Sequence, residues 1–211
     1  MGRFIFLAIL VVACASVGFA QSTDYKKFEF FGGYSHNRVD TGLDDSDTGL
    51  TVVINEREGF NGFNTSVTGN ITRYVGLKLD VAGHYKNKTF PFGIGGSTLE
   101  IDSSVYNFLG GVQVKDNASE GTFKPFAHAL VGAAHARNHV TFNGGCIAIV
   151  PSPCPNSTDT DTGLAGAFGG GLDIRVNNRF DVRAIQLDYN PTRVFDATQH
   201  NFRFGVGIVI H

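Results

Sequence analysis

The seven histidines are the first candidates for chemistry, because imidazole serves as a general base and as a metal ligand near neutral pH. They are scattered along the chain, at His36, His84, His128, His135, His139, His200 and His211. His135 and His139 would share one face of a helix, but they do not sit side by side in a strand. Two histidines alone make a poor metal site, and no Gly-x-Ser-x-Gly nucleophile elbow occurs. We therefore expect no catalytic site, no metal and no cofactor.

Two other stretches could bind ions or phosphate. Carboxylates gather at Asp40, Asp44, Asp45 and Asp47, without the spacing or the closing Glu of a calcium-binding EF-hand loop. A solvated loop is the expectation, with weak contact to divalent cations as the alternative. The run Gly169-Gly170-Gly171 is followed by neither a helix start nor a Lys, so close strand packing explains it better than phosphate binding.

The cysteines fit an exported protein. Cys14 lies near the N-terminus, whereas Cys146 and Cys154 lie in a segment rich in Gly and Pro. Outside the cytoplasm an even pair at short spacing predicts a disulfide. We expect Cys146 and Cys154 to close a short loop, because a metal site there would need further ligands.

The N-terminus has the layout of a secretory signal. Arg3 precedes an apolar run over residues 4–12, which is too short to span a bilayer, and small residues lead to Ala20 and Gln21. This predicts a signal peptide over residues 1–20, cleaved between Ala20 and Gln21, and one mature domain over 21–211. A short membrane anchor and a lipoprotein signal at Cys14 are the alternatives. The near balance of 17 Lys and Arg against 19 Asp and Glu argues against a nucleic-acid partner.

The mature chain alternates apolar and polar residues with a period of two, which indicates strands. Val75, Leu77 and Leu79 oppose Lys78 and Asp80, and the last residues repeat the pattern. Eight strands are predicted, at 25–38, 58–69, 74–87, 102–114, 122–137, 162–175, 179–190 and 199–210. A bulge is expected near Ile185 or Gln186, because strict alternation would put Arg183 and Asp188 on opposite faces.

The connections between these strands alternate in length. Short ones are predicted at 69–73, 115–121 and 176–178, and long ones at 39–57, 88–101, 138–161 and 191–198. In an up-and-down barrel this places all short turns on one rim, as in outer-membrane barrels. The fold class is therefore all-β: an eight-stranded antiparallel up-and-down transmembrane β-barrel behind a cleavable signal peptide.

Charged residues occupy the polar rows that such a barrel turns inward. We expect them to form an ion-pair network in the lumen, because a buried charge is costly unless it is paired. The predicted members are Glu29, Lys78, Asp80, Asp173, Arg175, Arg183, Asp188 and Arg203. A soluble periplasmic binding barrel, with its apolar row inside, is the alternative.

Short segments at 28–35, 59–64, 124–129, 169–173, 183–189 and 201–208 resemble the small bacterial outer-membrane barrels of the OmpA-transmembrane-domain and opacity-protein type. This resemblance implies a bacterial outer-membrane location, contact with lipid and lipopolysaccharide, insertion by the barrel assembly machinery, and long loops that touch an extracellular ligand. It implies a non-enzymatic envelope role, with a small passive channel as the alternative and a lipid-modifying enzyme as a third reading. One departure is that family members often end on an aromatic residue, whereas this chain ends on His211.

Overall fold

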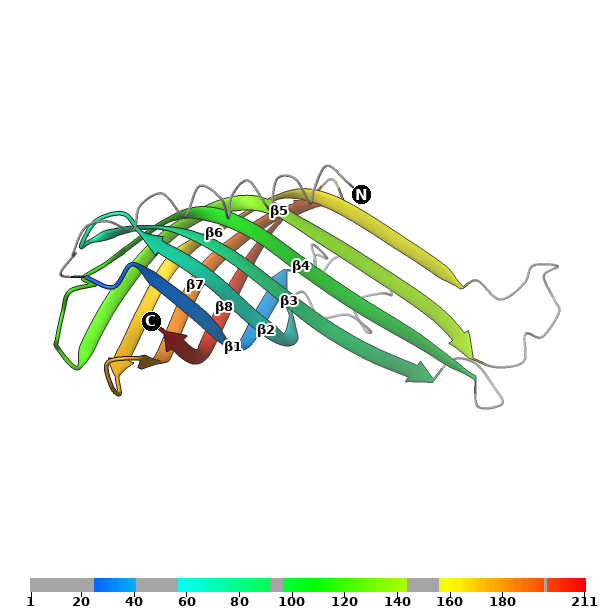
Figure 1. The fold of residues 1–211 in the computed structure, drawn as a ribbon. Coiled ribbons are helices and arrows are strands. Elements are labelled where there is room, and N and C mark those ends of the chain that lie inside the picture. The colour runs from blue at the N-terminus through cyan, green and yellow to red at the C-terminus, as the bar shows by residue number, and fades with distance from the viewer. Residues whose placement is uncertain (1–24, 41–56, 92–96, 144–155, 196) are drawn as a thin grey trace, which may run out of the picture.

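The computed structural model describes residues 25–40, 57–91, 97–143, 156–195 and 197–211. These form one closed antiparallel barrel in which each strand pairs with the next and β8 pairs with β1 (Figure 1). Its eight strands confirm the predicted eight-stranded antiparallel up-and-down β-barrel. They are β1 (Phe28–Asp40), β2 (Arg57–Asn70), β3 (Val75–Pro91), β4 (Thr98–Lys115), β5 (Phe123–Asn143), β6 (Ser157–Arg175), β7 (Phe180–Val194) and β8 (Ala197–Ile210). In these ranges, no helix has the length and apolar character needed to cross a membrane.

The two rims of the barrel differ. At one rim, the turn end, residues 71–74, 116–122 and 176–179 connect the strands; the opposite rim is the loop end. The central strands β3 to β6 project beyond the others at the loop end (Figure 1). The predicted long loops 88–101 and 138–161 are therefore wrong in part, because β3 reaches Pro91 and β5 reaches Asn143. The predicted long loop 191–198 is wrong, since only residues 195–196 join β7 to β8.

These errors share a cause. Above the apolar belt the strands carry polar side chains on their outer face, such as Asn87, Asp102 and Thr160, so the alternation fades. Backbone pairing continues regardless: Asn87 lies opposite Asp102, and Asn138 lies opposite Asp159. Backbone N–H and C=O groups must be hydrogen-bonded in any strand, whereas an apolar outer row is required only where the strand faces lipid.

The seam between β1 and β8 closes the barrel. Their register runs from Phe30 opposite Ile210 to Arg38 opposite Phe202. Gly33 faces Gly207 there, and a Cβ on Gly33 would lie 2.1 Å from the carbonyl oxygen of Val206. The two strands meet at a distance that only glycine permits.

The bulge predicted in β7 is confirmed. The pairing of β7 with β8 shifts register between Arg183 and Gln186, and the pairing with β6 shifts between Leu172 and Asp173. The shift turns both Arg183 and Asp188 into the barrel, where each is at most 3 % exposed. Close packing also explains the glycine run, since a Cβ on Gly169 would lie 2.0 Å from the carbonyl oxygen of Leu187.

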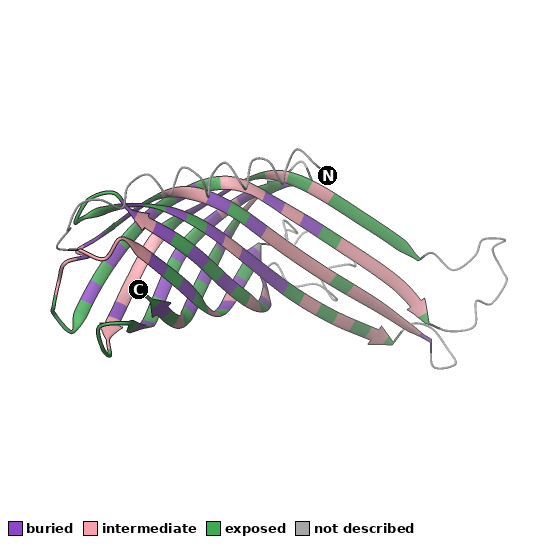
Figure 2. Ribbon diagram, viewed as in Figure 1, coloured by how far each residue is buried: buried purple, intermediate pink, exposed green. Residues whose placement is uncertain are grey.

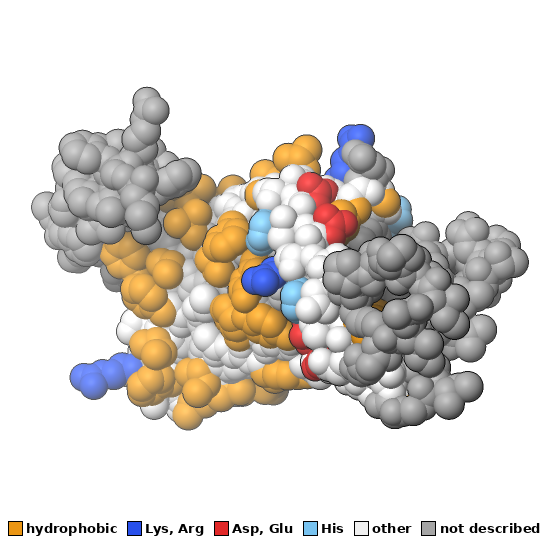
Figure 3. All heavy atoms as spheres, turned by 90° about the vertical axis from the view of Figure 1, so that its right-hand side faces the viewer, with side chains coloured by type: hydrophobic (Ala, Val, Ile, Leu, Met, Phe, Trp, Pro, Cys, Tyr) orange, Lys and Arg blue, Asp and Glu red, His pale blue; other side chains and the backbone are white. Residues whose placement is uncertain are grey.

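Burial alternates along much of β1, β2, β3, β5, β7 and β8 (Figure 2), and the apolar row points outward. Side chains such as Leu77, Leu79, Leu187 and Phe204 are 44–58 % exposed on the outer wall, where hydrophobic side chains gather (Figure 3). A large exposed apolar surface marks contact with a membrane or a partner. The inverted pattern, apolar outside and polar inside, is that of a membrane barrel.

Tyrosines lie toward both edges of this apolar wall. Tyr25 and Tyr74 lie at the turn end. Tyr85 and Tyr189 lie in the loop-end halves of β3 and β7, and Tyr34 and Tyr106 lie near the middle of β1 and β4. The hydroxyl of Tyr85 donates to that of Tyr106 at 2.9 Å. Aromatic girdles of this kind flank the apolar band at both membrane interfaces.

Candidate functional site

The lumen holds the densest group of charges in the described chain. Ten charged side chains are buried there, and their charges balance. We call them, with His128 and His211, the lumen network. The cations are Lys78, Lys115, Lys124, Arg183 and Arg203, and the carboxylates are Glu29, Asp80, Asp173, Asp181 and Asp188.

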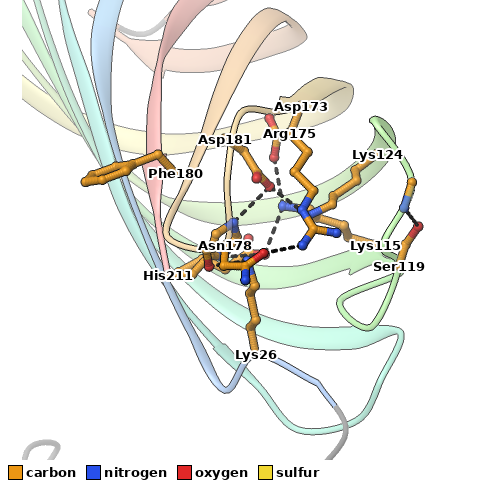
Figure 4. Close-up of polar contacts among 12 residues, drawn as sticks. Lys26, Lys115, Ser119, Lys124, Asp173, Arg175, Asn178, Phe180, Asp181 and His211 are labelled. Carbon is orange, nitrogen blue, oxygen red and sulfur yellow. Dashed lines mark hydrogen bonds and ion pairs between the residues drawn. The ribbon is translucent and has the colours of Figure 1, made fainter.

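Near the turn end, two lysines bridge strands that are not neighbours (Figure 4). Lys115 Nζ lies 2.9 Å from Glu29 Oε1 and 2.8 Å from Asp173 Oδ2, which ties β4 to β1 and β6. Lys124 Nζ lies 3.1 Å from Asp181 Oδ2. The ring of the C-terminal His211 lies 2.8 Å from the same oxygen of Asp181, so the end of the chain is held inside the barrel.

Arg183 occupies the next layer. Its Nε and Nη2 donate to the two oxygens of Asp173 at 2.8 and 3.1 Å, and its Nη1 donates to Gln186 Oε1 at 2.9 Å. Its guanidinium lies 4.3 Å from the ring centre of Phe31 and 4.0 Å from that of Phe126. Two aromatic faces and a bidentate carboxylate suit the planar guanidinium.

Arg203 links the middle of the lumen. It donates from Nη1 to Asp80 Oδ1 at 2.8 Å, and its Nη2 lies 2.7 Å from Asp188 Oδ2. His128 lies between Lys78, at 3.3 Å from its Nδ1, and Asp188, at 2.8 Å from its Nε2. Together these contacts connect β3, β5, β7 and β8 across the interior.

An apolar layer lies above the charges, toward the loop end. It is the cluster of buried residues Leu109, Leu130, Ala134, Ala136, Ala165, Ala167 and Val194. Leu130, Ala134 and Ala167 have no exposed surface. The layer comes from β4 to β7 and includes buried amides, because Asn107 Nδ2 donates to Asn190 Oδ1 at 3.4 Å. Charged, apolar and polar side chains together fill the lumen. The apolar layer was missed from the sequence, because Leu109 and Leu130 stand among small residues in their inward rows.

Seven of the eight residues expected in the lumen lie in the network. The eighth, Arg175, lies at the turn end, where it forms an ion pair with Glu120 and a hydrogen bond with Asn178. Sequence reasoning missed Lys115, Lys124 and Asp181. Lys115 was assigned to a turn, although it continues the inward row of Gln113, and the other two stand next to strand ends.

The histidines do not assemble a catalytic group in the described ranges. Ser35 Oγ and His84 Nε2 lie 2.9 Å apart, but both side chains are fully buried. His84 Nδ1 has no hydrogen-bond partner among the described residues, so no acid orients the ring. On the outer wall, His135 and His139 contact Thr162 and Thr158. No group of three His, Cys, Asp or Glu in the described chain could hold a metal.

Several expected features lie outside the described residues. They are the signal peptide with Ala20 and Gln21, the cysteines Cys146 and Cys154, and the acidic residues Asp44, Asp45 and Asp47.

Exposed ion pairs lie at the turn end, beyond the strands. Arg73 donates to both oxygens of Asp116 at 2.8 Å. This bidentate contact lowers the pKa of the Asp116 carboxyl below its ordinary value, and the contact with Arg175 lowers the pKa of Glu120 in the same way. The first pair joins two neighbouring turns, and the second joins the end of β6 to the turn before β5.

A family model described as "Outer membrane protein beta-barrel domain" matches residues 5–209 of the chain. The chain belongs to this outer-membrane barrel family. It is therefore a protein of the bacterial outer membrane, as the outward apolar wall and its tyrosine girdles require. No curated protein matches it.

Two solved outer-membrane proteins are similar to this chain. Ail, the attachment invasion locus protein of Yersinia pestis, solved with the heparin analogue sucrose octasulfate, has a TM-score of 0.55 and 16 % identity over 87 % of this outer-membrane barrel and 97 % of Ail. OprG from Pseudomonas aeruginosa matches with a TM-score of 0.46 and 12 % identity, over 90 % of this chain and 98 % of OprG. At these identities the likeness concerns the fold alone.

Proposed function

We propose that this protein is a non-enzymatic, sealed outer-membrane barrel that serves the envelope as a structural element and presents its loop end to the exterior. The observation that carries this proposal is the balanced lumen network beneath an apolar layer. Five cations and five carboxylates leave no net charge to attract an ion, and the apolar layer disfavours water above them.

A passive channel is the competing proposal, and the burial within the lumen weighs against it. Arg183, Arg203, Lys78 and Lys115 are each at most 2 % exposed. Removing a partner from such a pair leaves an uncompensated charge, so opening the lumen would require several pairs to break together. A conducting pore instead keeps an interior that water fills.

The loop end supports the surface role. There β3 to β6 extend past the apolar belt and carry polar outer faces, with Asn87 bonded to Glu100 and Asp102. Ail, which shares the fold, was solved with a bound heparin analogue. This complex supports a surface role for the present barrel, with lipid and lipopolysaccharide around its wall.

Permeation tests the sealed lumen. Proteoliposomes with the purified protein should swell in isotonic solutions of small sugars or amino acids no faster than protein-free liposomes. Swelling that depends on solute size would show a channel and contradict the proposal.

Lipid analysis tests the absence of enzymatic activity. Mass spectrometry of lipid A should give identical spectra for cells with and without the protein. A mass change that disappears in a Ser35→Ala or His84→Ala variant that still inserts would instead assign a lipid-modifying reaction to that pair.

Two features of maturation belong to the same proposal. Cleavage after Ala20 should leave Gln21 as the first residue, which intact mass and N-terminal peptide analysis would show. The pair Cys146 and Cys154 should resist alkylation until a reductant is added. Retention of residues 1–20, or free thiols in the native protein, would contradict these expectations.

A further inference from the structure

The lumen opens at the loop end into a cavity of about 470 Å³. Inward-facing residues of β1 to β5, β7 and β8 line it, together with Phe195 of the β7–β8 turn. Ala136 and Val194 belong both to its lining and to the apolar layer, and Val105 packs against that layer. The apolar layer therefore forms part of the inner end of the cavity.

Most of the cavity wall is apolar. Val39, Phe60, Ile101, Val140 and Ala197 contribute to it from five different strands. Its volume falls within the range of small-molecule sites, which are usually apolar with a few placed polar groups. Such a wall favours binding of a molecule with an apolar part.

One side of the cavity is cationic. Glu58 is 7 % exposed, and it receives Lys86 Nζ at 3.7 Å and an ion pair from Lys88. Both lysines line the cavity, and their side chains keep 34 % and 23 % of their surface exposed. Among the described lining residues, two ammonium groups and one carboxylate give one excess positive charge beside an apolar wall.

Phe195, which lines the cavity, has an unusual backbone conformation. Its φ is 52°, and it is the one non-glycine residue with a positive φ in the described chain. This conformation is costly for an aromatic residue and clusters at ligand-binding segments. The carboxylate of Asp161 accepts the amide of Phe195 and holds this conformation. This hydrogen bond holds the backbone of Phe195, which forms part of the cavity wall.

We propose that this cavity is a binding pocket for a small amphipathic anion, with one acidic head group and a short alkyl or aryl tail. The tail lies against Phe60, Val140 and Phe195, and the head group binds Lys86 and Lys88. This deepens the proposed surface role and rests on the sealed lumen, since an open floor would make the pocket a passage.

The test uses the full mature chain in lipid nanodiscs and radiolabelled octanoate as the probe. Equilibrium dialysis measures bound octanoate, and nanodiscs without protein give the lipid background. Octanol and octyltrimethylammonium, which share the tail, test the head group. The charge variants are Lys86→Gln with Lys88→Gln, and Glu58→Gln. Arg137→Gln is the matched control, because Arg137 is exposed on β5 beside the lining residue Asn138 but does not line the cavity.

We expect one octanoate per barrel, bound more tightly than octanol and far more tightly than octyltrimethylammonium. Loss of both lysines should weaken octanoate binding by about tenfold, the scale of a charge-assisted hydrogen bond. Glu58→Gln should strengthen binding, since it frees both ammonium groups, and Arg137→Gln should leave it unchanged. If the Glu58 ion pairs served the fold alone, both variants would weaken octanoate binding or leave it unchanged. Opposite changes in affinity therefore indicate that the lysines bind the head group.

Binding no greater than to empty nanodiscs, or binding indifferent to the head group and to both charge variants, would overturn the pocket. The swelling assay keeps the two proposals apart. A sealed barrel that binds no octanoate contradicts the pocket alone, whereas a permeable barrel contradicts the proposed function.

Discussion

Arg203 on β8 donates a 2.8 Å hydrogen bond to Asp80 on β3, across the lumen and over 123 residues of sequence. Two strands, β1 and β2, lie between these partners in the wall. The contact therefore ties opposite parts of the barrel together rather than adding to a strand ladder.

Replacement of Arg203 by Met should strongly destabilise the barrel. It leaves Asp80 and Asp188 without their shared cation, and breaking a buried pair typically costs about 3–5 kcal/mol. Urea unfolding in lipid vesicles, followed by the heat-dependent gel shift, measures the loss. Arg193→Met is the control, because Arg193 is exposed on β7, and it should change little. Equal unfolding midpoints for the two variants would contradict the network.

Arg183→Lys should lower stability although it keeps the charge. Lysine lacks the planar fork that reaches both oxygens of Asp173 and packs between Phe31 and Phe126. A loss of about 1–2 kcal/mol is expected. Phe126→Leu in the parent and in the Arg183→Lys background completes a double-mutant cycle. Strictly additive losses would mean that the ring and the guanidinium do not interact.

A charge on the outer wall tests which face meets lipid. Leu187, near the middle of β7, is 44 % exposed on that wall. Leu187→Arg should cost about 2–4 kcal/mol in a bilayer. Thr160→Arg, on the exposed outer part of β6, should fold as well as the parent. If both variants unfold at the same urea concentration, the apolar wall does not face lipid.

Acid should weaken the turn end. Because the folded pKa of Asp116 lies below its ordinary value, through its contact with Arg73, the pair stabilises above the unfolded pKa of about 4. This contribution is lost as the pH falls through the folded pKa. Asp116→Asn should thus be less stable than the parent at neutral pH, by a small amount because the pair is exposed. Unfolding midpoints measured from pH 7 to pH 2 should converge at the acid end; a constant gap would contradict the pair's role.

The strands followed from the sequence because each membrane-crossing segment must keep one continuous apolar face. That rule locates Leu77 and Phe204 outside and Lys78 and Arg203 inside, and the conflict between Arg183 and Asp188 predicts the bulge. Outside lipid a strand no longer needs an apolar face, so the alternation fades there. For this reason the sequence assigned the loop-end parts of β3 to β6 to loops.

Contacts across the lumen do not follow from alternation. Nothing in the spacing pairs Lys115 with Glu29, or places Phe31 and Phe126 around Arg183. The contact of His211 likewise does not follow from the alternation. Ile210 completes the outward apolar row, and His211 adds one inward position that reaches Asp181. His211 is thus held inside the barrel.

Single-channel recording in planar bilayers tests the sealed lumen most directly. The inserted parent protein should show no steady ion current across a range of voltages, because five buried cations are each paired with carboxylates or packed against aromatic rings beneath the apolar layer. A large, steady conductance from folded, heat-modifiable protein would contradict the account.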